Sequence, residues 1–143
     1  MDSARGSGQL VQQEDAGTIT TSFRFHAKNL DSVSDEAKGT VSFTNRQGSL
    51  SQSAKRSIEC LRVDTLGGDK VGYLVFVITE SSGTDAPSVG TRIGVNILDT
   101  GQKHGEGDGV FGEPIGESAS CVDPTGVVEP LTKGNIQIRG TSA

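Results

Sequence analysis

The stretch TITTSFRFHAK, residues 18–28, decides the fold class of this chain. Apolar residues such as Ile19, Phe23 and Phe25 occupy alternate positions, and polar or charged residues lie between them. Successive side chains of a β-strand point to opposite faces, so this alternation predicts a strand with one buried face. We expect the two phenylalanines to face an apolar interior.

Similar short apolar runs recur along the rest of the chain, and none of them repeats with a helical period. Glycine-rich, acidic segments separate the runs and are typical of turns. Besides residues 18–28, strands are expected over residues 39–46, 55–64, 71–80, 91–99, 117–123 and 135–140. The pattern predicts an all-β fold, a single antiparallel β-barrel or sandwich of six to eight strands over residues 18–143. Residues 1–17, rich in Ser, Gly, Gln and Asp, are expected to form a flexible leader.

Two of the runs carry a further signal. In residues 55–64 the apolar side chains change face, from Ile58 and Cys60 to Leu61 and Val63. Such a change inside one strand predicts a β-bulge or burial on both sides. Residues 71–80, VGYLVFVITE, are apolar on both faces, which is typical of a central strand.

Charge limits the classes of partner. The formal net charge is −5, and the longest basic cluster, Lys55 and Arg56, has two residues. An acidic surface repels a polyanion, so we expect no nucleic acid partner. No apolar segment reaches 18 residues, so we also expect no membrane span.

The two cysteines, Cys60 and Cys121, lie far apart in the sequence, and two states are open to them. A disulfide would close a loop of about 60 residues and stabilise the fold by about 4 kcal/mol in the chain-entropy model. The alternative is a pair of buried free thiols that pack as small apolar side chains. The first 17 residues lack the apolar core of a signal peptide, so either the protein is cytoplasmic or its export signal has been removed.

The segment VNILDTGQ, residues 95–102, resembles the active-site loop of aspartic proteases, in which Asp99 would share a proton with a second aspartate. The triplet lies about two-thirds of the way along the chain, and no second apolar segment is placed to support such a loop. A strand that ends in Asp-x-Gly is also an ordinary turn signal. We expect Asp99 to form a turn.

The glycine-rich segment 101–117 is expected to be an irregular, solvated loop. Its acidic residues Glu106, Asp108 and Glu113, together with Asp99, could place oxygens around Ca²⁺. Their spacing does not match an EF-hand loop or a calcium-binding glycine repeat. We therefore expect no metal and no cofactor. If a metal did bind, Asp99, Glu106 and Asp108 would be the candidate ligands.

No nucleophile motif is present, and the catalytic residues stay unknown. Cys60 or Cys121 could meet His26, but no G-x-S-x-G elbow occurs, and His104 in the acidic loop lacks a clear partner. One tyrosine and five phenylalanines are few for a carbohydrate surface built on ring stacking.

From SFRFHAK through GTVSF, IECLRV and VNILDTGQ to GNIQIRG, the order of landmarks resembles a group of small, uncharacterised β-proteins exported by actinobacteria. The resemblance covers residues 18–140. It implies an extracellular, noncatalytic barrel or sandwich, and it carries over no site residues.

Three hypotheses of function follow. The leading one is a secreted, noncatalytic binding or structural module, whose partner is a small apolar ligand held inside a barrel or another protein. The second is a small barrel enzyme of the cyclase or isomerase type, with a cavity lined by polar groups such as Asn96, Arg92 or Glu59. The third is a structural protein that self-associates through exposed edge strands.

Overall fold

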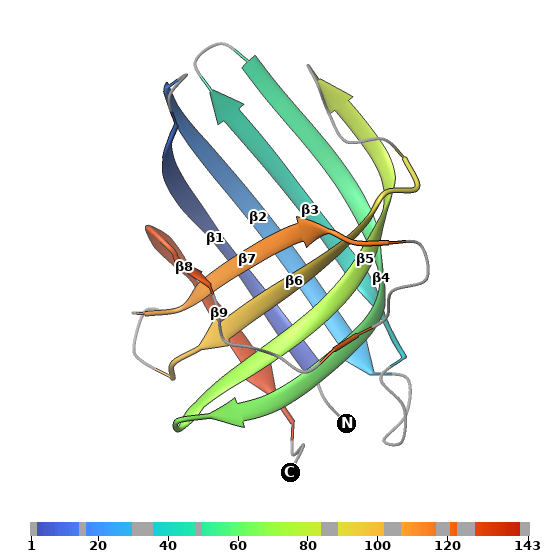
Figure 1. Ribbon diagram of the computed structural model, residues 1–143, viewed down its shortest axis with the longest axis vertical. Coiled ribbons are helices and arrows are strands. Elements are labelled where there is room, and N and C mark those ends of the chain that lie inside the picture. The colour runs from blue at the N-terminus through green and yellow to red at the C-terminus, as the bar shows by residue number, and fades with distance from the viewer. Residues whose placement is uncertain are drawn as a thin grey trace.

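A computed structural model of the chain (Figure 1) describes residues 3–14, 17–29, 36–47, 50–83, 89–101, 107–116, 121–122 and 128–140. These residues form one antiparallel sheet of nine strands and no helix. The strands are β1 (Ser3–Glu14), β2 (Gly17–Asn29), β3 (Ala37–Gln47), β4 (Leu50–Leu66), β5 (Asp69–Gly83), β6 (Arg92–Asp99), β7 (Gly109–Pro114), β8 (Glu129–Pro130) and β9 (Lys133–Arg139). The all-β, antiparallel fold is confirmed, but the expected six to eight strands are corrected to nine.

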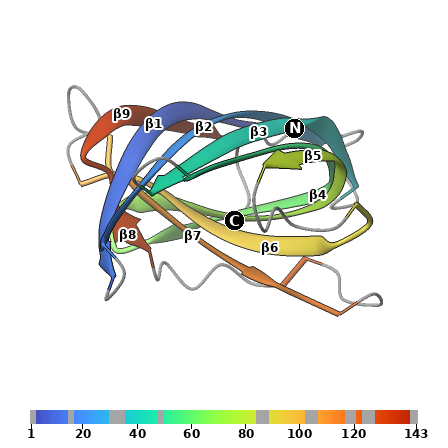
Figure 2. The same cartoon turned by 90° about the horizontal axis from the view of Figure 1, so that it is seen from above.

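The strands follow one another across the sheet in the order β8-β7-β6-β5-β4-β3-β2-β1-β9. Each strand pairs with its neighbour in sequence until the chain returns and places β9 beside β1. The sheet curls into a half-barrel, in which β1, β2 and β3 form one wall and β6 and β7 lie across from them (Figure 2). The curl is strong enough to bring β9 into contact with β6.

The strand β1 forms from residues that we expected to be a flexible leader, so that expectation is wrong. It pairs with β2 along one edge and with β9 along the other. Ala4 and Leu10 are buried, and Gly6 and Gly8 lie between them at alternate positions. A Cβ atom at Gly6 would lie 2.9 Å from a ring carbon of Phe25. The glycines therefore make room for inward side chains of the neighbouring strands, although in the sequence they are typical of a linker.

The bulge in β4 is confirmed. The register of β4 against β5 shifts between Ile58 and Cys60, so Ile58 and Leu61 are both buried while Glu59 is exposed. A bulge bends its strand and increases the local twist, which helps the sheet to curl. The central position of β5 is confirmed as well, because residues 71–76 are all buried.

Two other segments differ from expectation. The segment 101–117 contains β7, whose alternation of inward Val110 and Gly112 was hidden by the many glycines around it. Of the expected strand 117–123, the structure describes Cys121 and Val122, and both lie outside any strand.

One end of the half-barrel is filled with side chains. Along β2, Phe25, Ala27 and Asn29 are buried, whereas Thr21 and Phe23 are only partly buried. The buried cluster at this end is completed by residues from six other strands, β1, β3, β4, β5, β6 and β9: Ala4, Ala37, Val41, Ile58, Leu61, Val63, Leu74, Phe76, Ile97, Ile136 and Ile138. The interior therefore becomes more open toward the β1–β2 turn.

Two aspartates hold the curled sheet together where β9 approaches β6 and β7. Asp108 is 1% exposed, and its Oδ2 accepts a hydrogen bond from the backbone N–H of Ile136 at 2.9 Å. Its Oδ1 accepts from the backbone N–H and the hydroxyl of Thr100 at 2.9 and 3.0 Å. Asp99 Oδ2 accepts from the backbone N–H of Ile138 at 2.9 Å.

These contacts meet a need of the backbone. β9 is the last strand of the sheet, so alternate N–H groups along its free edge have no strand partner. A buried N–H without an acceptor destabilises the fold, and buried backbone groups are almost always paired. The two carboxylates take the place of the missing strand and hold the half-barrel closed at this end.

We expect Asp108→Asn to lower the free energy of unfolding by about 2–3 kcal/mol. An amide has one acceptor oxygen, so in either orientation its NH₂ group faces a backbone N–H donor, of Ile136 or of Thr100. Urea denaturation measures the loss. The control is Asp64→Asn, an exposed residue whose Oδ1 accepts from the backbone N–H of Thr65 at 2.7 Å, a bond that an amide oxygen can keep. The control should change stability by less than about 0.5 kcal/mol, and equal losses in both variants would contradict the closure role.

Candidate functional site

The half-barrel holds an apolar cavity of about 260 Å³ at its more open end. Side chains from β1, β2, β3, β5, β6, β7 and β8 line it. The lining residues are Leu10, Thr21, Phe23, Phe25, Val41, Phe43, Asn45, Leu74, Phe76, Ile93, Val95, Ile97, Val110, Phe111, Gly112 and Glu129. The expectation that Phe23 and Phe25 face the interior is confirmed, and Val41 and Phe43 of β3 face it as well.

The register of the sheet places these side chains in rows. On one wall Phe23 lies opposite Phe43, and Phe25 opposite Val41. The rings of Phe23 and Phe25 are stacked with their centroids 6.1 Å apart, an offset aromatic contact that stabilises the wall. Because alternate residues of each strand point inward, neighbouring strands in register form a continuous apolar lining.

The opposite wall, formed by β5, β6 and β7, also has its inward residues in register, and it leaves part of the cavity unfilled. Leu74 lies opposite Val95, and Val95 lies opposite Gly112. Gly112 has no side chain to fill the space beside Val95, whose methyl group would lie 3.1 Å from a Cβ atom at this position. Ile93, Val95 and Phe23 are partly exposed, so apolar surface in the cavity faces solvent.

A few polar groups interrupt the lining. The hydroxyl of Thr21 donates a hydrogen bond to Asn45 Oδ1 at 2.7 Å, which orients the amide of Asn45. Glu129, on the short strand β8, also lines the cavity. An apolar cavity with a small number of placed polar groups is the usual form of a site for a small organic molecule.

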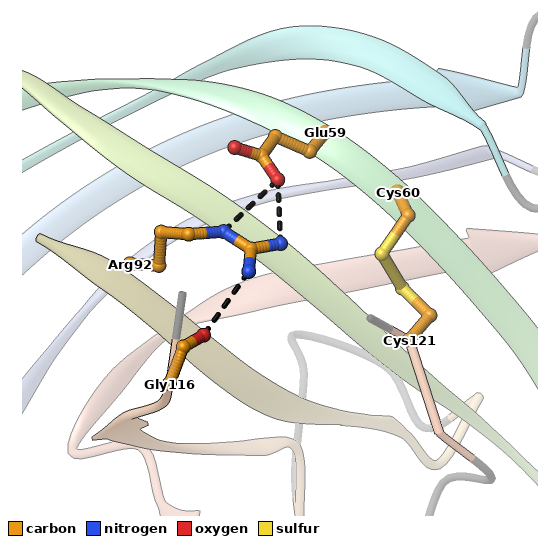
Figure 3. Close-up of polar contacts among 5 residues, drawn as sticks. All are labelled: Glu59, Cys60, Arg92, Gly116 and Cys121. Carbon is orange, nitrogen blue, oxygen red and sulfur yellow. Dashed lines mark hydrogen bonds and ion pairs between the residues drawn. A yellow bond between two sulfur atoms is a disulfide. The ribbon is translucent and has the colours of Figure 1, made fainter. Parts of the chain in front are cut away.

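The polar residues that we proposed for an enzymatic cavity lie elsewhere. Arg92 and Asn96 alternate with the inward Ile93, Val95 and Ile97 of β6 and therefore face outward. Arg92 Nε and Nη2 donate to Glu59 Oε2 at 3.2 and 2.7 Å, and Nη1 donates to Gly116 O at 3.1 Å (Figure 3). The structure thus joins Arg92 and Glu59 on the outer face, where they attach the chain after β7 to the sheet.

The cysteines are joined in a disulfide, which decides between the two states left open by the sequence. Cys60 on β4 and Cys121 are bonded beside the Arg92–Glu59 pair (Figure 3). Cys121 Sγ lies 3.5 Å from Tyr73 O, so Cys121 lies over the outer face of β5. Neither thiol is free to act as a nucleophile, and His26 lies on β2, on the outer face of another part of the sheet.

The aspartates at the ends of β6 and β7 have structural roles. Asp99 forms the expected turn, because its Oδ1 accepts from the backbone N–H of Gly101 at 2.9 Å. Both Asp99 and Asp108 use their carboxylates on backbone N–H groups, so they do not form a protease pair. Glu106, His104 and the side chain of Glu113 lie outside the described residues. Among the residues described, no group of three or more His, Cys, Asp or Glu is placed to hold a metal ion.

Sequence reasoning missed five lining residues. Leu10 was assigned to the leader, Val110, Phe111 and Gly112 to the irregular loop, and Glu129 lies outside every expected strand. The alternation of Ala4, Gly6, Gly8 and Leu10 was the available signal for β1, and it is weak because two of these four residues are glycine.

Comparison with protein-family models, with curated proteins and with solved structures finds no match for this chain. Within the ranges that the structure describes, no helix has the length and apolar character needed to cross a bilayer.

Reducing the disulfide should destabilise the protein. The bridge closes a loop across a sequence separation of 61, and the chain-entropy model gives a loss of about 4 kcal/mol on opening. We expect the midpoint of urea denaturation to fall when dithiothreitol is added. The double variant Cys60→Ser and Cys121→Ser is the control, since it should start at the lower midpoint and not respond to the reductant. A midpoint that stays constant in the native protein would show that the bridge contributes nothing to stability.

Proposed function

We propose that this protein is a noncatalytic binding module that holds a small, mostly apolar ligand in the half-barrel. The observation that carries the proposal is the cavity of about 260 Å³, whose lining of phenylalanine, isoleucine and valine side chains is partly exposed. Apolar surface removed from water contributes about 25 cal/mol per Å². A ligand that fills the cavity would therefore gain binding energy from the side chains that no part of the described chain covers.

The polar groups in the lining support a ligand with one hydrogen-bonding group. The amide of Asn45 is held by Thr21, so it offers a donor in a set orientation. Glu129 adds a negative charge and an acceptor, which disfavours an anionic ligand. A neutral apolar molecule with a hydroxyl or amine group fits this combination.

The disulfide supports export as part of the proposal. Disulfides persist in oxidising environments outside the cytosol and are rare inside it. The Cys60–Cys121 bridge joins β4 to the segment that covers β5. We infer that the module works outside the cell, where the bridge would be retained.

Binding of N-phenyl-1-naphthylamine, a neutral apolar dye whose fluorescence rises in apolar surroundings, tests the proposal. We expect saturable binding with a micromolar dissociation constant. Val95→Phe places a larger side chain in the cavity and should weaken binding at least about tenfold, because the dye and the added ring compete for one space. The matched control is Val11→Phe, at a position on the outer face that is 42% exposed. Equal affinity in both variants, or no fluorescence change with the native protein, would contradict the assignment.

A barrel enzyme of the cyclase or isomerase type is the second candidate. It is favoured by Glu129, because a carboxylate inside an apolar cavity can act as a general base. Liquid chromatography coupled to mass spectrometry, which resolves isomers by retention time, separates the two candidates when applied to a small molecule that co-purifies with the protein. Recovery of the molecule unchanged after incubation supports binding alone. Formation of an isomer by the native protein, but not by Glu129→Gln, would favour the enzyme.

A further inference from the structure

The outer face of the sheet concentrates positive charge, although the chain as a whole is acidic. Alternate residues of β9, β1, β2 and β3 point away from the cavity. The exposed basic residues among them are Arg5, Arg24, His26, Lys28, Lys38, Arg46, Lys133 and Arg139. The six other than Arg46 and Lys133 are here called the basic face. No aspartate or glutamate occurs among the described side chains of these four strands. Apart from Glu14 at the end of β1, the acidic residues that make the net charge −5 therefore lie outside these four strands.

The register brings like charges together. Lys28 lies directly opposite Lys38, and Arg5 lies opposite His26. Neighbouring strands are about 4.8 Å apart, and like charges that face each other across a strand pair are destabilising. Among the described residues, none of the basic-face side chains forms an ion pair with a carboxylate. Stability of the fold alone gives no reason for this arrangement, whereas an anionic partner would relieve it.

Two adjoining hollows lie on the basic face. One, of about 150 Å³, is lined by Arg5, His26 and Arg139, and the other, of about 400 Å³, by Arg5, His26 and Arg24. Arg5 Nε donates to Gln137 Oε1 at 2.9 Å, which orients the guanidinium between the hollows. A guanidinium in a set orientation can bind a carboxylate or sulfate through two parallel hydrogen bonds. The pair of hollows therefore fits a ligand with several anionic groups along its length.

The surroundings of these cations indicate the class of partner. Between them lie hydroxyl and amide side chains, such as Ser7, Ser42 and Asn135, which can bond to the hydroxyl groups of a sugar. Apart from the imidazole of His26, no outward side chain among the described residues of these four strands is aromatic, so successive bases of a single-stranded nucleic acid would find no row of rings for stacking.

The shape of the face also selects among partners. The basic face is the convex side of the curled sheet (Figure 2), so a flat bilayer would meet few of its cations at once. A flexible chain can follow the curve. Sugar rings need aromatic partners when they bind by stacking, but carboxylate and sulfate groups are recognised by charge.

We propose that the basic face binds an anionic polysaccharide that carries carboxylate or sulfate groups. The site lies on the opposite surface of the sheet from the cavity, so the two can be occupied independently. A protein outside the cell would use the basic face for attachment to a polymer and the cavity for its small ligand.

Isothermal titration calorimetry of the full chain at low salt tests this inference with two probes. Heparin oligosaccharides carry sulfates and carboxylates, and oligogalacturonate carries carboxylates alone. We expect binding to at least one of them, a preference between them that identifies the anionic group, and weakening with added salt. Neutral dextran should not bind. Failure of both anionic probes would overturn the proposal.

The variant Arg5→Gln, Arg24→Gln and Lys28→Gln removes three positive charges from the basic face. At about fivefold per cation, the affinity should fall roughly 100-fold. The control is Leu66→Asp, Ser82→Asp and Val89→Asp, at three exposed positions outside the basic face, which lowers the net charge by the same three units. It should weaken binding by less than about threefold, because distant charges are screened. Equal weakening in both variants would overturn the proposal.

Two further measurements complete the test. Both triple variants should bind N-phenyl-1-naphthylamine as the native protein does, which establishes that they fold. If the native protein does not bind the dye, folding is established by a far-ultraviolet circular dichroism spectrum that matches the native one. The affinities for single-stranded DNA and for vesicles containing phosphatidylserine are compared with those for the two polysaccharides at equal charge. Tighter binding of the DNA or of the vesicles than of both polysaccharides would overturn the assignment to a polysaccharide.

Discussion

Asp108 joins the residues at the ends of β6 and β7 to β9 and to the residues just before it. It accepts hydrogen bonds from Thr100 and from Ile136, and the backbone oxygen of Asp108 accepts another from Leu131 at 3.0 Å. A curled antiparallel sheet that does not close leaves a strand edge without partners. Here two side-chain carboxylates serve that edge, so β9 can approach β6 without a tenth strand. The cavity depends on this constraint, because a flatter sheet would not bring its two walls face to face.

The same strands serve two surfaces. In β2, Phe23 and Phe25 line the cavity. Arg24 and His26, which alternate with them along the strand, belong to the basic face. Period-two alternation therefore encodes an apolar interior and a cationic exterior in one segment. The small residues of β1 complete the arrangement, since Gly6 gives room to Phe25 on the inside while Arg5 faces outward.

A second layer protects the other part of the sheet. The disulfide at Cys60 and the ion pair of Arg92 with Glu59 both attach the chain after β7 to the outer face of β4 and β6. The ion pair joins β4 to β6 across β5, whose outward Val71, Tyr73 and Val75 are buried. The β4 bulge places Glu59 where it reaches Arg92, so an irregularity of one strand positions the ion pair that holds the cover. Covalent and ionic attachment together compensate for a chain with only 32% hydrophobic residues.

The local sequence pattern was sufficient to predict much of the fold and part of the lining of the cavity. The alternation in residues 18–28 and the two-sided apolar run in residues 71–80 identified β2 and β5, because strand period and burial are properties of a few consecutive residues. The face change at Cys60 likewise indicated the bulge. β1 and β7 were missed because glycine at inward positions carries no hydrophobic signal, and their pairing depends on neighbours remote in sequence.

What the sequence by itself determined is the all-β class and the inward direction of the phenylalanines, since alternation is read along one strand. Only the tertiary structure decided that Asp99 and Asp108 bind the backbone of β9, that Cys60 meets Cys121, and that scattered basic residues form one face. Each of these depends on strand order and register, which bring together residues as far apart in the sequence as Arg5 and Gln137.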